Sequence, residues 1–187
     1  MEVGVDEVGR GSLAGPLVVG LVSLNKDILG LKDSKLLTPK QREKMSKQIY
    51  TASQAASLGW VWPHEIDQIG LTKATTLAIK RALKLICVPI DVIILDGNYN
   101  YLPDYTNVKT MINADELVPA VSAASIIAKV ARDNYMKNIA RYFPNYSFNS
   151  HVGYGTKAHF LAISANGPCC LHRLSFSPFN KELRNSL

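Results

Sequence analysis

Two adjacent carboxylates, Asp6 and Glu7, interrupt an apolar stretch, Val3–Val8, near the start of the chain. A charged group in a core strand is costly unless it is paired or binds a metal ion. Neighbouring residues on a strand face opposite sides, so both carboxylates reach one ion only if the strand bends or ends there. The glycines of Gly9–Gly11 permit such a distortion. The alternative is that one or both acids simply face solvent.

Two further acids, Asp96 and Asp115, occupy positions that are typical of ligand-binding sites but also of turns and helix starts. Asp96 follows the nearly all-apolar run Asp91–Leu95 and forms an Asp-Gly turn signal with Gly97. Ligand sites in α/β proteins gather at strand ends. Asp115 precedes a long predicted helix, where the helix dipole also favours an acid. Taken singly, each of these acids favours a turn or a helix start over a catalytic site.

Convergence of these four acids would change that interpretation. Their mutual repulsion would have to be offset, and oxygen ligands without histidine or cysteine favour Mg²⁺ or Mn²⁺ over zinc. Such a site fits phosphodiester hydrolysis with two ions about 3.5–4 Å apart, one for the attacking water and one for the departing 3′-oxygen. The four candidates for catalysis and metal binding are Asp6, Glu7, Asp96 and Asp115.

The hydrophobic pattern predicts the elements that must position these acids. Residues 2–8 and 16–24 predict two strands joined by a tight, glycine-rich connection. Thr38–Gln41 is typical of a capped helix start and predicts a helix to about Ala52. Further strands are predicted at 57–62, 91–95 and 106–112, and further helices at 71–86, from Pro119 to about Tyr142, and from Thr156 to before Gly167. This order favours an α/β fold with a mixed sheet and helices on its faces.

The composition is that of a globular protein. Hydrophobic residues make up 47% and charged residues 19%, which excludes a disordered chain. We expect residues 1–187 to form a single domain, with a mostly helical extension packed on it from about residue 145. The net charge of +6 is compatible with a polyanionic partner without establishing one.

The sequence argues against membrane and secreted classes. The longest weakly polar run, Leu13–Leu24, is shorter than the ~20 residues that a bilayer requires. The acidic N-terminus does not resemble a secretory signal. Cys87, Cys169 and Cys170 match no disulfide framework and no zinc motif, so we expect reduced, packed thiols and a cytoplasmic protein.

Several blocks of sequence, spread over nearly the whole chain, carry a family resemblance. They are Gly4–Gly11, Ala14–Pro16, Asp33–Leu37, Leu95–Asn98, Ala114–Asp115, Val118–Asp133, Gly153–His159 and His172–Phe176. In this order they resemble the type 2 ribonucleases H, and ribonuclease HII in particular. The related ribonuclease HIII carries an additional N-terminal domain and lacks the arginine of the glycine element. Arg10, and a start almost at the first strand, therefore favour ribonuclease HII.

The resemblance implies an RNase H-like fold with a mixed five-stranded central sheet flanked by helices. It implies an endoribonuclease that cleaves the RNA strand of RNA–DNA hybrids and incises on the 5′ side of a single ribonucleotide embedded in duplex DNA. The products would be 3′-hydroxyl and 5′-phosphate ends, and the cofactor Mg²⁺ or Mn²⁺. By the same match, the catalytic metal-site acids are Asp6, Glu7, Asp96 and Asp115, although Glu116 adjoins Asp115 and is easily confused with it.

The resemblance also assigns substrate-binding residues. Gly9, Arg10 and Gly11 resemble the element that reads the ribonucleotide 2′-hydroxyl, because glycines let the backbone approach the sugar and that hydroxyl separates RNA from DNA. Tyr154 resembles the family tyrosine that packs on the sugar. The alternatives are a turn glycine pair with a surface arginine, and a tyrosine that fills the edge of the core.

Weaker expectations concern other polar residues. Ser122 and Ser125 are expected to permit close packing of a small-residue helix, with contact to the substrate as the alternative. His172 and Arg173 are expected to tie the C-terminal segment down. Candidate phosphate contacts, none of them singled out, are Lys35, Lys129, Arg132 and Lys157.

Two other functions stay open at this level. A non-catalytic binder of hybrid duplexes is disfavoured by the intact acids, because carboxylates without metal weaken phosphate binding. A DNA nuclease of the same fold would need the acids but not the glycine element or Tyr154. We expect a monomer. The short C-terminus shows no obvious sliding-clamp-binding motif, which leaves clamp binding open.

Overall fold

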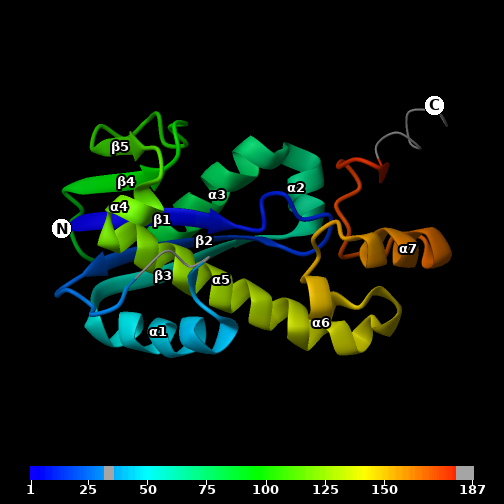
Figure 1. Cartoon of the computed structure of the whole chain (residues 1–187). Helices are drawn as coiled ribbons and strands as arrows, with labels where there is room; N and C mark the ends of the chain where they lie inside the picture. The colour runs from blue at the N-terminus through cyan, green and yellow to red at the C-terminus, as the bar shows by residue number, and fades with distance from the viewer. Residues whose placement is uncertain (32–35, 180–187) are drawn as a thin grey trace.

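The computed structural model describes residues 1–31 and 36–179. At its centre is a five-stranded sheet with helices on both faces (Figure 1). Lys35, one of the predicted phosphate contacts, lies outside the described residues. Within those residues, no helix combines the length and the apolar character that a membrane crossing requires.

The strand order is β3-β2-β1-β4-β5. Strand β1 (Glu2–Val8) pairs antiparallel with β2 (Leu17–Leu24), which pairs antiparallel with β3 (Ser53–Val61). On its other side β1 runs parallel to β4 (Val92–Asp96), and β4 runs parallel to β5 (Val108–Met111). This is the mixed five-stranded sheet that the sequence predicted. The first strand is therefore central and lies beside the strand that ends at Asp96.

Helix α5 (Pro119–Ile139) lies directly against β1 and β2 on one face of the sheet. A Cβ atom added at Gly4 would lie 2.2 Å from the Ala120 carbonyl carbon, and one added at Gly20 would lie 2.1 Å from the Ala124 oxygen. No side chain fits between the helix backbone and these strands. This close approach brings the helix against the strand that carries the paired carboxylates.

Helix α1 (Pro39–Ala52) packs beside α5 and begins as predicted. The Thr38 amide donates to Gln41 Oε1 at 2.8 Å, and the Gln41 amide donates to Thr38 Oγ1 at 3.4 Å, which forms a capping box. Met45 and Ile49 bury the inner side of the helix in the same apolar cluster as the middle of α5.

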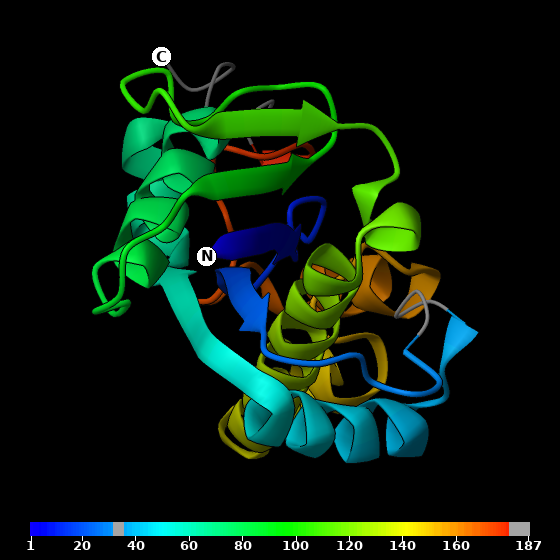
Figure 2. The ribbon, with the colours of Figure 1, turned by 90° about the vertical axis from the view of Figure 1, so that its left-hand side faces the viewer.

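The opposite face is covered by α3 (Leu71–Leu83), with α2 (Pro63–Ile69) at its N-terminal end. Figure 2, which views the sheet from the side of the N-terminus, shows α3 and α5 on opposite sides of the strands. The sequence does not predict helix α2, because the expected strand 57–62 stops directly before Pro63 and no loop signal announces a new element. In fact Pro63 is the first residue of the helix, and Glu65 Oε2 accepts from the Trp62 amide at 2.9 Å.

The C-terminal elements gather beyond the far end of α5 (Figure 1). The helix predicted to run to Tyr142 ends at Ile139 and is continued by a 3₁₀ turn. Helix α7 begins after Thr156, whose side chain accepts from the His159 amide at 3.2 Å, as the sequence predicted. The elements of this region are η2 (Ala140–Tyr142), η3 (Pro144–Tyr146), α6 (Phe148–His151) and α7 (Lys157–Asn166).

The three cysteines are free thiols, as expected. Cys169 is partly buried, but Cys87 and Cys170 are exposed, so the prediction that all three are packed is wrong. Cys87 follows the end of α3, where the apolar stripe of the helix has already ended. Cys87 and Cys170 therefore contribute little to the core, whereas Cys169 packs against the apolar cluster of the C-terminal elements.

Candidate active site

The four predicted acids line one pocket, with a volume of about 440 Å³. It lies at the ends of β1 and β4 and along the first turns of α5. The same pocket contains the four residues that the resemblance assigns to the substrate sugar, Gly9, Arg10, Gly11 and Tyr154. Its lining comprises Asp6, Glu7, Val8, Gly9, Arg10, Gly11, Asp96, Asp115, Ser125, Lys129 and Tyr154.

Asp6 and Glu7 both reach the pocket because β1 ends beside them. The strand stops at Val8, and Gly9 takes a φ of 85°, a conformation that favours glycine. The Glu7 amide donates to Asp6 Oδ1 at 2.7 Å. Neighbouring residues inside a strand face opposite sides of the sheet. Because the strand ends beside Asp6 and Glu7, both side chains nevertheless reach the same pocket.

Asp96 and Asp115 are linked through the backbone. Asp96 is the last residue of β4, and its Oδ1 accepts from the Ala114 amide at 2.8 Å. That bond fixes the start of α4 (Ala114–Leu117), in which Asp115 is buried and Glu116 is exposed. Asp115 lines the carboxylate pocket and Glu116 does not. The geometry thus distinguishes two acids that are easily confused in the sequence.

Negative charge is concentrated in this pocket. Burial, the charge of Glu7 and the charge of Asp96 raise the pKa of Asp6 to about 7, although a hydrogen bond with Ser125 opposes the shift. Burial also raises the pKa of Glu7, against the lowering effect of Arg10, whose Nη1 lies 3.7 Å from Glu7 Oε1. The pocket therefore favours a proton or a cation near Asp6.

The connection from Gly9 to Pro16, here called the glycine loop, is held by Arg132. This guanidinium is fully buried and donates to the Pro16 carbonyl at 2.9 Å, to Ser12 Oγ at 2.8 Å and to the Val152 carbonyl at 2.9 Å. The suggestion that Arg132 contacts phosphate is therefore wrong. Its donors are used inside the protein, where they shape the loop that enters the pocket.

Arg173 holds the same loop from the C-terminal side. It is fully buried and donates to the Gly15 carbonyl at 2.9 Å and to the Arg10 carbonyl at 3.0 Å. His172 forms an antiparallel bridge with Ala14. The prediction that His172 and Arg173 tie the C-terminal segment down is confirmed, and the tie is made to the glycine loop.

The side chain of Arg10 lies along the pocket wall. Its Nη1 donates to the Tyr101 hydroxyl at 2.7 Å and to Thr75 Oγ1 at 3.1 Å, beside Glu7. Gly11 is exposed, and no atom lies within 4 Å of the place where its Cβ would stand. The glycine loop therefore presents open backbone next to an anchored guanidinium.

Tyr154 closes the pocket between two cations. The Lys129 ammonium lies 5.5 Å and the Arg132 guanidinium 5.3 Å from the centre of its ring. Lys129 also pairs with Asp133 at 3.0 Å and lines the pocket, whereas Lys157 is exposed outside it. Of the suggested phosphate contacts that lie within residues 1–31 and 36–179, Lys129 is therefore the one at the pocket.

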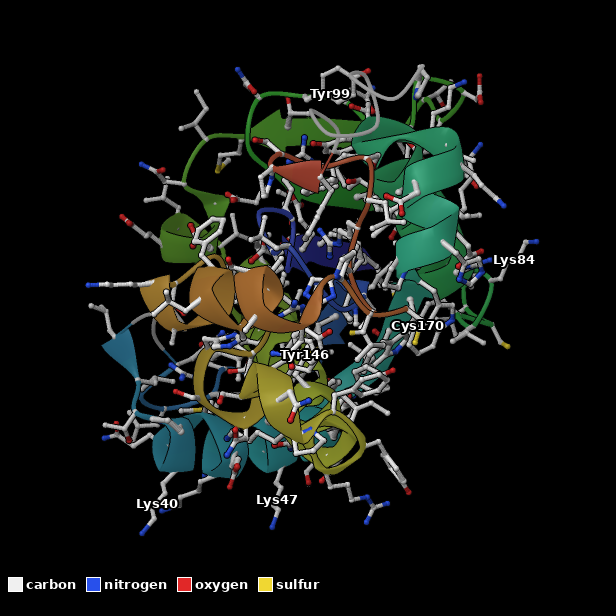
Figure 3. The ribbon with its side chains drawn as sticks, turned by 90° about the vertical axis from the view of Figure 1, so that its right-hand side faces the viewer. Lys40, Lys47, Lys84, Tyr99, Tyr146 and Cys170 are labelled. Carbon is white, nitrogen blue, oxygen red and sulfur yellow. The ribbon has the colours of Figure 1, made fainter. Side chains whose placement is uncertain are left out.

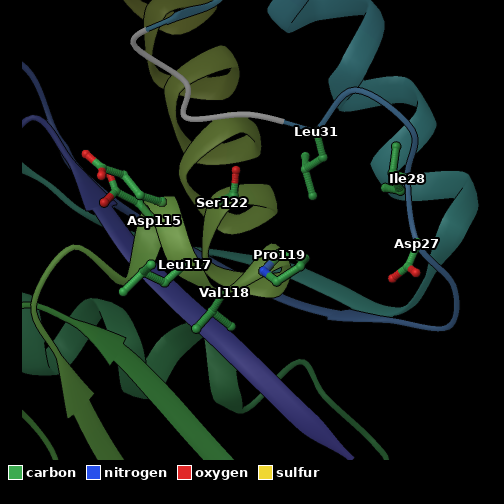
Figure 4. Close-up of a pocket in the computed structure, with 9 residues that line it drawn as sticks. Asp27, Ile28, Leu31, Asp115, Leu117, Val118, Pro119 and Ser122 are labelled. Atoms are coloured by element: carbon green, nitrogen blue, oxygen red, sulfur yellow. The ribbon is translucent and has the colours of Figure 1, made fainter.

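Two serines of α5 differ in a way that the sequence did not reveal. Ser125 lines the carboxylate pocket and hydrogen-bonds to Asp6, so the packing role expected for it is incomplete. Ser122 faces a neighbouring pocket of about 350 Å³ that shares Asp115 (Figure 4). Its Oγ is buried without a hydrogen-bond partner among residues 1–31 and 36–179. A small-residue helix face gives no signal that separates these two positions.

Comparison with known proteins identifies the family. The ribonuclease HII family model matches residues 3–178. Ribonuclease HII of Nitrosococcus oceani is 42% identical over 96% of this chain and 90% of its own length. Ribonuclease HII of Shewanella amazonensis is 44% identical over 96% and 88%. The crystal structure of ribonuclease H2 from Pyrococcus horikoshii superposes with a TM-score of 0.81 at 28% identity, covering 98% of this chain and 97% of that one. The chain therefore belongs to the ribonuclease HII family, the endonucleases that cleave the RNA strand of RNA–DNA hybrids.

Proposed function

We propose that this ribonuclease H also incises duplex DNA on the 5′ side of a single embedded ribonucleotide, by two-metal hydrolysis that leaves 3′-hydroxyl and 5′-phosphate ends. One observation carries the proposal: a single pocket is lined by four carboxylates and also by the Gly9–Gly11 backbone and Tyr154. The carboxylates suit metal ions, and the other residues suit a ribose. Their shared pocket supports recognition of the sugar at the place where the phosphodiester is cut.

The donor set fits Mg²⁺ or Mn²⁺. The residues that would hold the ions, Asp6, Glu7, Asp96 and Asp115, offer carboxylate oxygens only. The raised pKa of Asp6 supports this fit, because a cation would relieve its repulsion by Glu7 and Asp96. In the described part of the chain, no three His, Cys, Asp or Glu side chains form a ready-made metal-binding group. When bound, the ions supply the charge that activates water and stabilises the leaving oxygen.

The protein's own side chains would orient the substrate strand. Lys129 is the cation of α5 that lines the pocket, and it suits a phosphate oxygen at the mouth. Ser125 holds the Asp6 carboxyl, and Asp96 stays aligned through its bond from the Ala114 amide. These contacts fix the acids before substrate arrives, which preserves their geometry for the reaction.

Recognition of the sugar would rest on the glycine loop and Tyr154. Open backbone at Gly11 allows a ribose to approach closely, and a 2′-hydroxyl gives the loop a hydrogen-bonding group that deoxyribose lacks. The Tyr154 ring offers a flat surface on which the sugar can pack. One lost hydrogen bond of this kind corresponds to about 1 kcal/mol or more, at least about a fivefold preference that adds to the contact of the sugar with Tyr154.

A duplex DNA with one embedded ribonucleotide tests the proposal. The protein is incubated with this substrate in Mg²⁺, in Mn²⁺ or in EDTA, and the product ends are mapped. We expect incision 5′ of the ribonucleotide only when metal is present. An all-DNA duplex of the same sequence is the control and should remain intact.

Other outcomes would contradict the proposal in distinguishable ways. Cutting of the all-DNA duplex would show that the sugar is not read. Cutting of a continuous RNA–DNA hybrid without cutting at the single ribonucleotide would restrict the enzyme to hybrids. Incision at full rate in EDTA would exclude the role assigned to the four carboxylates.

A further inference from the structure

Three buried histidines in the C-terminal elements have no part in the proposed reaction. His151, His159 and His172 are at most 7% exposed, and we call them the histidine cluster. The rings of His151 and His159 stack with centroids 4.3 Å apart, and those of His159 and His172 lie 5.2 Å apart. Phe148 packs edge-on against His159, and Tyr146, labelled in Figure 3 among these elements, packs against His172.

A single assignment of the ring protons satisfies the hydrogen bonds of His159 and His172. His159 Nδ1 lies 2.9 Å from the Tyr154 carbonyl, which can only accept, so Nδ1 carries the proton. His159 Nε2 is then an acceptor, and His172 Nε2, 3.1 Å away, donates to it. That leaves His172 Nδ1 to accept from the Cys169 amide at 2.9 Å. The Cys169 carbonyl, at 3.3 Å from the same nitrogen, is the longer and competing contact.

This chain of bonds ends on the backbone of Tyr154. The Tyr154 carbonyl accepts from His159 Nδ1 at 2.9 Å and from the Thr156 amide at 2.9 Å. The residue whose ring lines the carboxylate pocket is therefore held from behind by a side chain that lies outside the pocket.

The backbone before Tyr154 needs such support. Val152 has a φ of 44° and Gly153 a φ of 88°, and a left-handed conformation is strained for a β-branched residue such as valine. His151 stabilises this turn, because its Nδ1 accepts from the Gly153 amide at 3.2 Å while its Nε2 donates to the Tyr146 carbonyl at 2.7 Å. Strain of this kind persists only where the surroundings fix it, and it is concentrated at functional sites.

We propose that His159 is a positioning residue: its Nδ1–H, oriented by His172, holds the Tyr154 backbone so that the tyrosine ring stands against the ribose of the substrate. The proposal rests on the proposed function, because it concerns the contact of Tyr154 with the sugar. The backbone on both sides of His172 is bonded to the glycine loop, because the Gly15 amide donates to the Leu171 carbonyl at 2.8 Å and the Arg173 amide donates to the Leu13 carbonyl at 2.9 Å. Both elements that meet the sugar are thus held by one buried network.

Two substitutions of His159 test whether this residue positions the Tyr154 backbone or only packs in the histidine cluster. His159→Asn retains an N–H donor near the Nδ1 position, and His159→Gln places its amide near the Nε2 position and loses the donor to Tyr154. Both variants lose the stacked ring and should be destabilised to a similar extent, which thermal unfolding will measure. His64→Asn, on the exposed side of α2, is the control substitution.

Steady-state kinetics on the embedded-ribonucleotide duplex with Mg²⁺ provides the readout. We expect His159→Gln to raise KM about tenfold with kcat nearly unchanged, and His159→Asn to stay within about twofold of the wild-type KM. In a Tyr154→Ala background, His159→Gln should raise KM no further. His172→Asn keeps an acceptor for the Cys169 amide but removes the donor to His159, and it should also raise KM.

The outcomes distinguish this inference from the function on which it rests. Equal KM values for His159→Asn and His159→Gln, or an unchanged KM in His172→Asn, would overturn the positioning role while the incision assay still succeeds. An unchanged KM in Tyr154→Ala would remove the sugar contact itself, and the inference with it. If the His159 variants do not fold at the assay temperature, His172→Asn decides the question alone.

Discussion

Asp96 performs two tasks with one carboxylate. It lines the pocket with the other acids, and its Oδ1 accepts the Ala114 amide that starts α4. Asp96→Asn keeps an oxygen for that amide but loses the negative charge. We therefore expect an unchanged melting temperature and a turnover reduced by more than about a hundredfold. Asp104→Asn, at an exposed ion pair with Lys80, is the matched control and should retain full turnover.

Arg10 is expected to act on selectivity more than on catalysis. Its guanidinium is anchored by Tyr101 and Thr75 beside the open backbone of Gly11. Arg10→Ala frees the loop but leaves the four acids in place. We expect the preference for a ribonucleotide over a deoxyribonucleotide to fall about tenfold, the equivalent of one lost hydrogen bond, while the Mg²⁺ dependence is retained. An unchanged preference in competition assays would remove this role from the glycine loop.

At the scale of elements, the contact of α5 with the sheet leaves no room for a side chain at Gly20. A Cβ at Gly20 would lie 2.1 Å from the Ala124 oxygen, and neither backbone has room to yield. We expect Gly20→Ala to lower the free energy of unfolding by about 3 kcal/mol or more. Gly11→Ala, where no atom lies within 4 Å and φ is not positive, should change the free energy of unfolding by less than about 1 kcal/mol. Denaturant unfolding of the two variants measures the difference.

The elements that local chemistry specifies were predicted well. The capping pair Thr38 and Gln41 set the start of α1, and Thr156 set the start of α7. Helix α2 was missed because Pro63 ends one element and begins another without a loop between them. The early start of β3 at Ser53, directly after α1, was missed for the same reason. Local sequence signals mark where one element ends. They do not show that the next element begins directly after it, without a loop.

Residue types together with the family resemblance singled out the acids and the glycine element, and His172 and Arg173 were expected to tie the C-terminal segment down. The other supporting side chains were not predicted. The acids and the glycine element are unusual in their apolar surroundings, which makes them visible in the sequence. Arg132 looks like any surface arginine of a helix, and only the fold shows that it is buried against the glycine loop. Nothing in the sequence pairs His159 with His172, because that contact depends on how the C-terminal elements pack.

For the whole molecule, the histidine cluster predicts a pH dependence of stability. Burial and the neighbouring His159 lower the pKa of His172 from 6.5 to about 4, so the folded state resists the proton that the unfolded state accepts. The resulting loss of stability begins as the pH falls below about 6.5 and is complete near pH 4, where it is on the order of 3 kcal/mol. Above pH 6.5 this contribution should be constant.

Comparison with a variant isolates that contribution. The raised pKa of Asp6 acts in the opposite direction, because protonation of this buried acid stabilises the fold as the pH falls below about 7. We therefore expect the change in the free energy of unfolding between pH 6.5 and 4, measured in EDTA, to be less favourable for the wild type than for His172→Asn by up to about 3 kcal/mol. His64→Asn should match the wild type. Parallel curves for all three proteins would contradict the prediction.

The bonds from Arg173 to the glycine loop have a consequence for biosynthesis. Arg173 stands 158 residues after Gly15, so the glycine loop leaves the ribosome long before the side chain that anchors it has been made. The sheet and α5 are available before that moment, but the sugar-facing backbone is not yet fixed. We therefore expect products that terminate before Arg173 to lack the preference for a ribonucleotide that the anchored glycine loop confers.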